Sequence, residues 1–143
     1  MDVGKALTTH LVGRQLAQVR RREFDWNFSF GDDAVSGLSV ECPWRIIDAN
    51  RIAFSSSDDG HKFGLATPLN GGEVALDLLG AKTIERVSIR SDTGDISIFF
   101  SNDSVLEVLN MSSGYEGWNI GIPGLSVVAT GGGELAIIKR SEP

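Results

Sequence analysis

The sequence has few of the residues that bind metal ions or perform catalysis. Its 143 residues include one cysteine and two histidines. A single cysteine, Cys42, excludes an intramolecular disulfide, and the histidines and scattered carboxylates lack the spacing of a zinc site or a calcium loop. His10 and His61 lie far apart in the sequence, and no local motif joins either of them to a nucleophile. We therefore predict no catalytic residues, no metal site and no cofactor.

Long hydrophobic runs are also missing. No run approaches the ~20 apolar residues that a membrane-spanning helix needs. The first residues, Met1-Asp2-Val3-Gly4-Lys5, are not a basic region followed by an apolar core, so we expect no signal peptide and a cytoplasmic location.

Basic residues are outnumbered, 13 against 19 acidic ones, which gives a net charge of −6. This balance disfavours binding to nucleic acid or to anionic membranes and suits a basic protein partner. Acidity that serves solubility alone is the other interpretation.

The most regular feature of the sequence is a two-residue alternation of apolar side chains. Ile96, Ile98 and Phe100 alternate with Asp95, Ser97 and Phe99, and Leu106 and Val108 continue the pattern after Ser101-Asn102-Asp103-Ser104. A period of two places alternate side chains on one face of a strand, and Asn and Asp tolerate the positive φ of a tight turn. This stretch is therefore predicted to be a β-hairpin.

An earlier stretch repeats this hairpin. Residues 28–35 align without a gap on residues 98–105, and Leu38-Ser39-Val40 matches Leu106-Glu107-Val108 after two extra residues. Trp44-Arg45-Ile46 then matches Trp118-Asn119-Ile120. Because any two aromatic hairpins share part of such a pattern, the repeat is a hypothesis that strand order and direction must test. It predicts two hairpin units, in halves of about 11–50 and 80–122, within a single domain 1–143.

Two segments have helical spacing. Asn70 precedes Glu73 by three residues, as in a helix N-cap, and Val74 and Leu78 lie four residues apart, so we predict a helix over about 71–79 that ends in a left-handed Gly80. A second short helix is predicted within 2–12. The fold class is therefore mainly β, with α+β as the alternative: antiparallel sheets, as in a β-sandwich, with one or two short helices. The predicted core residues are Phe28, Phe30, Leu38, Val40, Ile96, Ile98, Phe100, Leu106, Val108 and Trp118.

Candidate contact residues lie in three polar turns. Residues 55–62 are the most polar segment and are expected to form an exposed loop. Near residue 118 we expect the tryptophan in the core and the preceding tyrosine packed over the hairpin end, although aromatic residues also serve as interface anchors. The candidate partner-binding residues are Asp32, Asp33, Asp58, Asp59, His61, Tyr115 and Glu116.

The combination of Gly114-Tyr115-Glu116-Gly117-Trp118 with a Gly131–Ala136 ending resembles a loose set of small bacterial proteins, over residues 11 to 138. Some of these look like immunity proteins of polymorphic or contact-dependent toxin systems. The resemblance implies a cognate toxin domain as partner, blocked at its active site, and carries over no catalytic residue. We expect a monomer or a weak dimer. The alternatives are a structural or adaptor domain and a β domain that binds a small ligand without catalysis.

Overall fold

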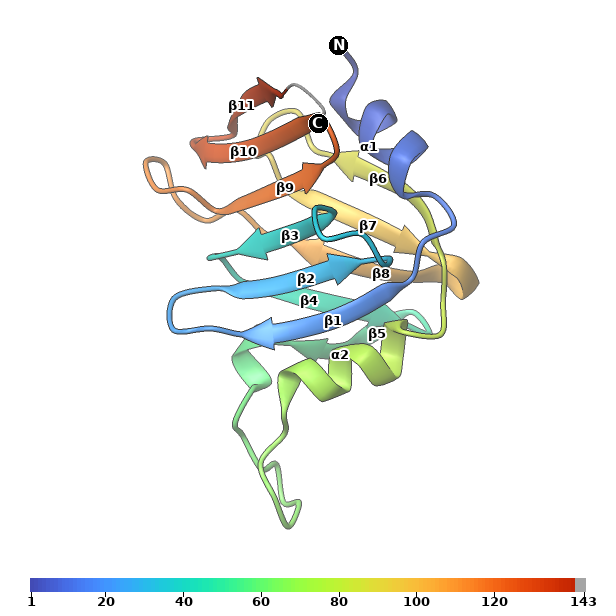
Figure 1. The fold of residues 1–143 in the computed structure, drawn as a ribbon. Helices are drawn as coiled ribbons and strands as arrows, with labels where there is room; N and C mark the ends of the chain where they lie inside the picture. The colour runs from blue at the N-terminus through green and yellow to red at the C-terminus, as the bar shows by residue number, and fades with distance from the viewer. Residues whose placement is uncertain (141–143) are drawn as a thin grey trace.

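The computed structural model describes residues 1–140 and consists of two antiparallel sheets packed face to face (Figure 1). One sheet has the strand order β1-β2-β3-β9-β10-β11 and the other has the order β5-β4-β8-β7-β6. The first half contains α1 (Val3–Leu11), β1 (Leu16–Arg21), β2 (Trp26–Phe30), β3 (Gly37–Val40), β4 (Trp44–Asp48) and β5 (Arg51–Ser55). The second half contains α2 (Gly71–Leu79), β6 (Ile84–Ile89), β7 (Ile96–Phe100), β8 (Ser104–Val108), β9 (Trp118–Ile122), β10 (Leu125–Gly131) and β11 (Glu134–Lys139). The predicted class, mainly β with two short helices, is confirmed.

The two halves have the same order of elements and exchange strands reciprocally. Strands β1, β2 and β3 lie in one sheet and their counterparts β6, β7 and β8 lie in the other. The next two strands of each half join the sheet of the other half: β4 pairs with β8, and β9 pairs with β3. Among the strands of the described residues, β11 alone has no counterpart in the first half.

The registers of the two halves also correspond. Trp118 lies opposite Val40, and Trp44 lies opposite Val108, each at the point where an exchanged strand joins the other sheet. Both β1–β2 and β6–β7 have an irregular register after the first pair. This is the arrangement expected of two copies of one unit, in the alignment that the sequence predicted.

The helices close the two edges of the sandwich. Helix α1 packs on β6, and α2 packs on β1 (Figure 1). Each begins with a capping side chain, because Asp2 accepts a hydrogen bond from the Lys5 N–H (3.0 Å) and Asn70 accepts one from the Glu73 N–H (3.1 Å). Every predicted core residue is buried.

Three local predictions need correction. Gly80 is right-handed (φ −63°), and an added Cβ there would lie 2.6 Å from the Leu76 carbonyl oxygen, so crowding explains this glycine better than a left-handed cap does. The alternation over residues 35–47 predicts one long strand with an edge or a break at Pro43; the structure has the break there, and the two parts, β3 and β4, lie in different sheets. Tyr115 does not pack over the hairpin end, because it is 83% exposed, whereas Trp118 is buried as predicted.

Candidate functional site

The most prominent surface feature is a loop that extends beyond the sandwich between β5 and α2 (Figure 1). Its base is closed by two hydrogen bonds, from Gly60 N–H to the Leu69 carbonyl and from Leu69 N–H to the His61 carbonyl, both 2.9 Å. We call residues 60–69 the projecting loop. These two bonds fix the base of the loop, and a third, from the Leu65 N–H to the Lys62 carbonyl (2.8 Å), forms a turn within it.

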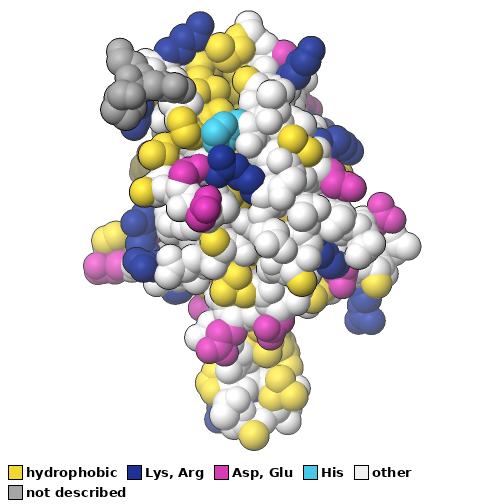
Figure 2. All heavy atoms as spheres, turned by 45° about the vertical axis from the view of Figure 1, so that its right-hand side comes forward, with side chains coloured by type: hydrophobic (Ala, Val, Ile, Leu, Met, Phe, Trp, Pro, Cys, Tyr) yellow, Lys and Arg dark blue, Asp and Glu magenta, His cyan; other side chains and the backbone are white. Residues whose placement is uncertain are grey.

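The projecting loop carries large apolar side chains into solvent. Phe63 is 66% exposed and Leu65 is 57% exposed. Figure 2 shows hydrophobic side chains gathered on this lobe, with acidic side chains at its neck. The His61 ring stacks on the Phe63 ring, with centroids 5.6 Å apart. Exposed apolar side chains on an ordered protrusion are typical of a protein interface.

Two predicted contact residues hold the base of this loop instead of pointing away from it. Asp58 accepts a hydrogen bond from the Ser55 N–H (3.0 Å). Asp59 accepts one from the Gly71 N–H (2.8 Å), at the start of α2, and pairs with Arg21 at 3.6 Å. Both carboxylates are half-buried. The segment 55–62, predicted to be an exposed loop, therefore begins with a short helical turn, Ser56–Asp58, and its last residues, 60–62, are exposed.

A second surface lies where β2, β3 and β9 meet the turns that precede or follow them. Phe24 is 81% exposed there, and Tyr115 is exposed beside Glu116. Burial and the nearby charges of Glu116 and Asp25 raise the pKa of Glu41, so these three carboxylates form one cluster. We call Phe24, Asp25, Glu41, Tyr115 and Glu116 the acidic rim. A hollow of about 280 Å³ lies among Phe24, Glu41 and Cys42. Burial raises the pKa of the Cys42 thiol to about 12.

The remaining predicted pair, Asp32 and Asp33, lies at the opposite end of the β2–β3 hairpin from this rim. Asp32 is exposed, and Asp33 is fixed by neighbours. It accepts hydrogen bonds from the Ser36 N–H (2.6 Å), the Val35 N–H (2.9 Å) and the Ser36 hydroxyl (2.9 Å), and it pairs with Arg14. These contacts, the Ser36 N–H first, hold the pKa of Asp33 well below its usual range. The seven predicted residues therefore lie at three separate places.

The same turn brings together a serine, a histidine and an aspartate. The Ser36 hydroxyl lies 3.3 Å from His10 Nε2, but it donates its hydrogen bond to Asp33. In a catalytic triad the carboxylate orients the histidine, which here it does not. Ser104 makes similar contacts without a histidine: its hydroxyl donates to Asp48 of β4 (2.5 Å) and accepts a hydrogen bond from Lys82. Arg14 and Lys82 each follow a helix, so both serines link a hairpin to the segment after a helix.

Within residues 1–140, no three or more His, Cys, Asp or Glu side chains are grouped closely enough to hold a metal ion. None of the helices described there is long and apolar enough to cross a membrane.

The alternation of Phe24, Trp26, Phe28 and Phe30 predicts a strand whose buried face includes Phe24, but β2 begins at Trp26 and Phe24 is 81% exposed. Sequence reasoning missed Phe63 and Leu65, because two apolar residues in a turn are too few for a strand or helix pattern. The available signal was their isolation: a large apolar residue inside a turn has no sheet face to fill. The sequence matches no protein-family model, and neither a curated protein nor a solved structure is detectably similar to it.

Proposed function

We propose that this protein binds a partner protein through the projecting loop. The observation that carries this proposal is the exposure of Phe63 and Leu65 on a loop whose base is closed by backbone hydrogen bonds. Burying two such side chains in a partner's pocket supplies the central apolar contact that protein interfaces need. The ordered loop keeps the entropic cost of binding low.

The partner that fits best is a basic bacterial toxin domain, as the resemblance to immunity proteins implies. The acidic rim adds Glu41 and Glu116 beside exposed Phe24 and Tyr115, and the chain has a net charge of −6. Complementary charge speeds the encounter of two proteins and fixes their orientation more than it sets affinity. The apolar loop tip would then supply affinity, and the rim would supply speed and specificity.

The test is co-expression with the toxin domain encoded beside this protein, followed by a pull-down. Wild-type protein should protect the cells and form a stable complex. The variant Phe63→Ser/Leu65→Ser should weaken that complex at least about tenfold, because each side chain is a candidate anchor. The matched control is Val12→Ser, which removes an equally exposed apolar side chain after α1, at the other side of the molecule.

Charge can be tested separately at the acidic rim. Glu116→Lys should slow association and reduce its salt dependence, with little effect on dissociation. Asp58 and Asp59 are unsuitable for this purpose because they hold the loop base. Unprotected cells and no complex with wild-type protein would remove the toxin proposal. An intact complex with the Phe63→Ser/Leu65→Ser variant would remove the projecting loop from the interface.

A further inference from the structure

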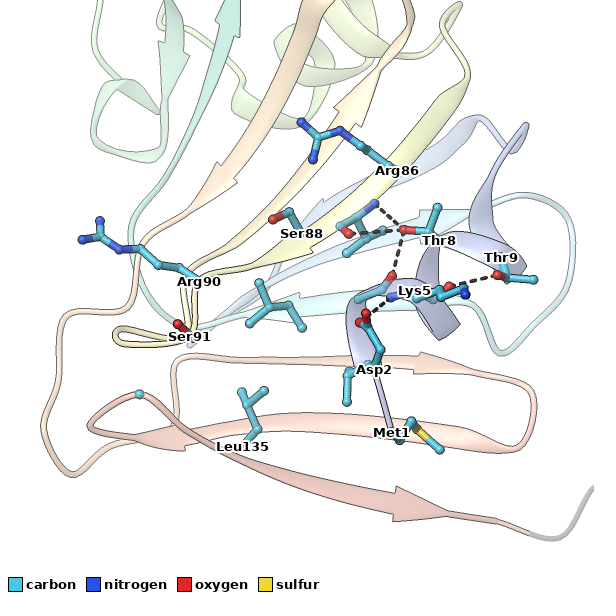
Figure 3. A pocket seen from close by; sticks show the side chains of 15 residues that line it. Met1, Asp2, Lys5, Thr8, Thr9, Arg86, Ser88, Arg90, Ser91 and Leu135 are labelled. Atoms are coloured by element: carbon cyan, nitrogen blue, oxygen red, sulfur yellow. Dashed lines mark hydrogen bonds between the residues drawn. The ribbon is translucent and has the colours of Figure 1, made fainter.

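A broad hollow lies far from the projecting loop, between α1, β6 and β11 (Figure 3). Its volume is about 850 Å³. It exists because one sheet has six strands and the other has five, so β11 extends past the edge strand β6 with no strand opposite to it. Leu135 of β11 points into this groove (Figure 3).

One end of the β6 edge is already occupied, and the other is free. The Thr8 hydroxyl of α1 accepts a hydrogen bond from the Val87 N–H (2.8 Å) and lies 3.2 Å from the Val87 carbonyl. Arg90 N–H instead faces β7, since it donates to the Asp95 carbonyl. Backbone groups alternate along an antiparallel strand. The N–H and C=O of Ile89 therefore point outward as those of Val87 do, into the groove, and no backbone partner meets them within residues 1–140.

The first half of the molecule shows what fills the corresponding place there. After β5 the chain runs past the start of α2 and the end of β1, where Asp59 bonds the Gly71 N–H and pairs with Arg21. Gly71 of α2 corresponds to Val3 of α1, since each directly follows the capping residue. Among the described residues, no carboxylate from elsewhere in the chain meets the Val3 N–H.

The reason for this difference is the path of the chain after the equivalent strand. Strand β10 turns back through Gly131, Gly132 and Gly133, all with positive φ, and continues as β11. Strand β5 continues instead into the segment that carries Asp59. The groove is thus the place that a chain segment occupies in one half and leaves open in the other.

The charge beside the groove indicates the chemistry of an occupant. The groove's charged lining residues are Asp2, Lys5, Arg86 and Arg90. Asp2 caps α1 and Arg90 pairs with Asp92, whereas neither Lys5 nor Arg86 forms an ion pair with a carboxylate in the described part of the chain. Arg86 lies over the Phe99 ring, 3.6 Å from its centroid, on the side of β6 away from β11. A strand added at Ile89 would alternate its side chains between Leu135 on one side and Arg86 on the other.

We propose that this groove binds an extended, acidic segment of a partner protein, added as a short strand along Ile89. Apolar side chains of the segment face Leu135, and its carboxylates face Lys5 and Arg86. Main-chain hydrogen bonds to a sheet edge supply affinity, and the alternating side chains supply specificity. The site is independent of the proposed function, because it shares no residue with the projecting loop or the acidic rim.

The probe is a synthetic peptide of residues 53–60, Ala-Phe-Ser-Ser-Ser-Asp-Asp-Gly, which joins the end of β5 to the segment that carries Asp59 in the first half. Titrated into isotope-labelled protein, it should shift the amide resonances of Val3, Ile89 and Leu135 in a saturable manner. A control peptide with both aspartates changed to asparagine should bind at least about fivefold more weakly, since it lacks the charge that Lys5 and Arg86 attract.

Protein variants separate this site from the loop. Lys5→Glu reverses an exposed charge on the first turn of α1 and should weaken peptide binding at least about tenfold. Phe63→Ser should leave peptide binding unchanged. No saturable shift up to about 1 mM peptide, a Kd that corresponds to roughly −4 kcal/mol, would overturn the proposal. So would shifts confined to Arg21 and Gly71, or self-association through the groove in sedimentation without peptide.

Discussion

The two tryptophans at corresponding positions, Trp44 and Trp118, provide an internal control for the cost of an unpaired polar group. Both are buried. The indole N–H of Trp118 donates to the Gly94 carbonyl at 2.8 Å, whereas the indole N–H of Trp44 finds no partner within residues 1–140. The difference follows from turn length. Gly94 lies in the β6–β7 turn, residues 90–95, and the β1–β2 turn spans only residues 22–25. The shorter turn lacks two residues and offers no carbonyl to Trp44.

The perturbation is substitution of each tryptophan by phenylalanine in turn. Both changes remove a similar volume from the core, so their packing costs largely cancel in the comparison. Trp118→Phe also leaves the Gly94 carbonyl without its donor, which costs about 1–3 kcal/mol. Trp44→Phe removes an unsatisfied buried donor and recovers a penalty of about the same size. Trp118→Phe should therefore lower the free energy of unfolding more than Trp44→Phe does, by about 2–6 kcal/mol.

Urea unfolding followed by far-ultraviolet circular dichroism measures this difference without relying on the fluorescence that the substitutions change. Trp26→Phe is a useful third variant, because the Trp26 ring lies edge-on to Trp44 with centroids 5.0 Å apart. It reports the cost of disturbing that aromatic cluster alone. Equal losses for the two main variants, or a larger loss for Trp44→Phe, would refute the reasoning from the indole hydrogen bonds.

Three further predictions concern single side chains. Asp33→Asn should destabilise the protein at neutral pH, and its difference from wild type in free energy of unfolding should shrink as the pH falls below 3.8, because contacts lower the folded-state pKa of Asp33 from that usual value. Asp32→Asn is the exposed control, and a difference that persists in strong acid would contradict this assignment. Cys42, with its pKa raised to about 12, should react with iodoacetamide at pH 8 at least about tenfold more slowly in folded than in urea-unfolded protein, and equal rates would show an accessible thiolate. Phe100→Ala should cost about 3–5 kcal/mol in urea unfolding, and a loss below about 1 kcal/mol would show that this buried ring contributes little to the core.

The sequence by itself determined the local structure of this protein. The alternation of apolar residues identified both hairpins and their core faces, because a strand places every second side chain on the same face. Asn70 and Glu73 identified α2, since a cap and its spacing are set within one turn of the chain. The match between Trp44-Arg45-Ile46 and Trp118-Asn119-Ile120 was also visible in the sequence. All of these features depend on residues that are close in sequence or similar in kind.

The tertiary structure alone decided which strands meet and which side chains are left over. Pro43 indicated an edge or a break between β3 and β4, but the sequence did not show that they join different sheets, because periodicity records the face of a residue and not the sheet that it joins. The exchange of β4 and β9 between sheets, and with it the unpaired Trp44 indole, depends on contacts distant in sequence. The candidate sites also depend on contacts distant in sequence. Asp58 and Asp59 were predicted as contact residues from their polarity, but in the fold they hold the base of a loop, and Phe63 and Leu65 are exposed instead. The exposure of a residue depends on how much of the rest of the chain packs over it.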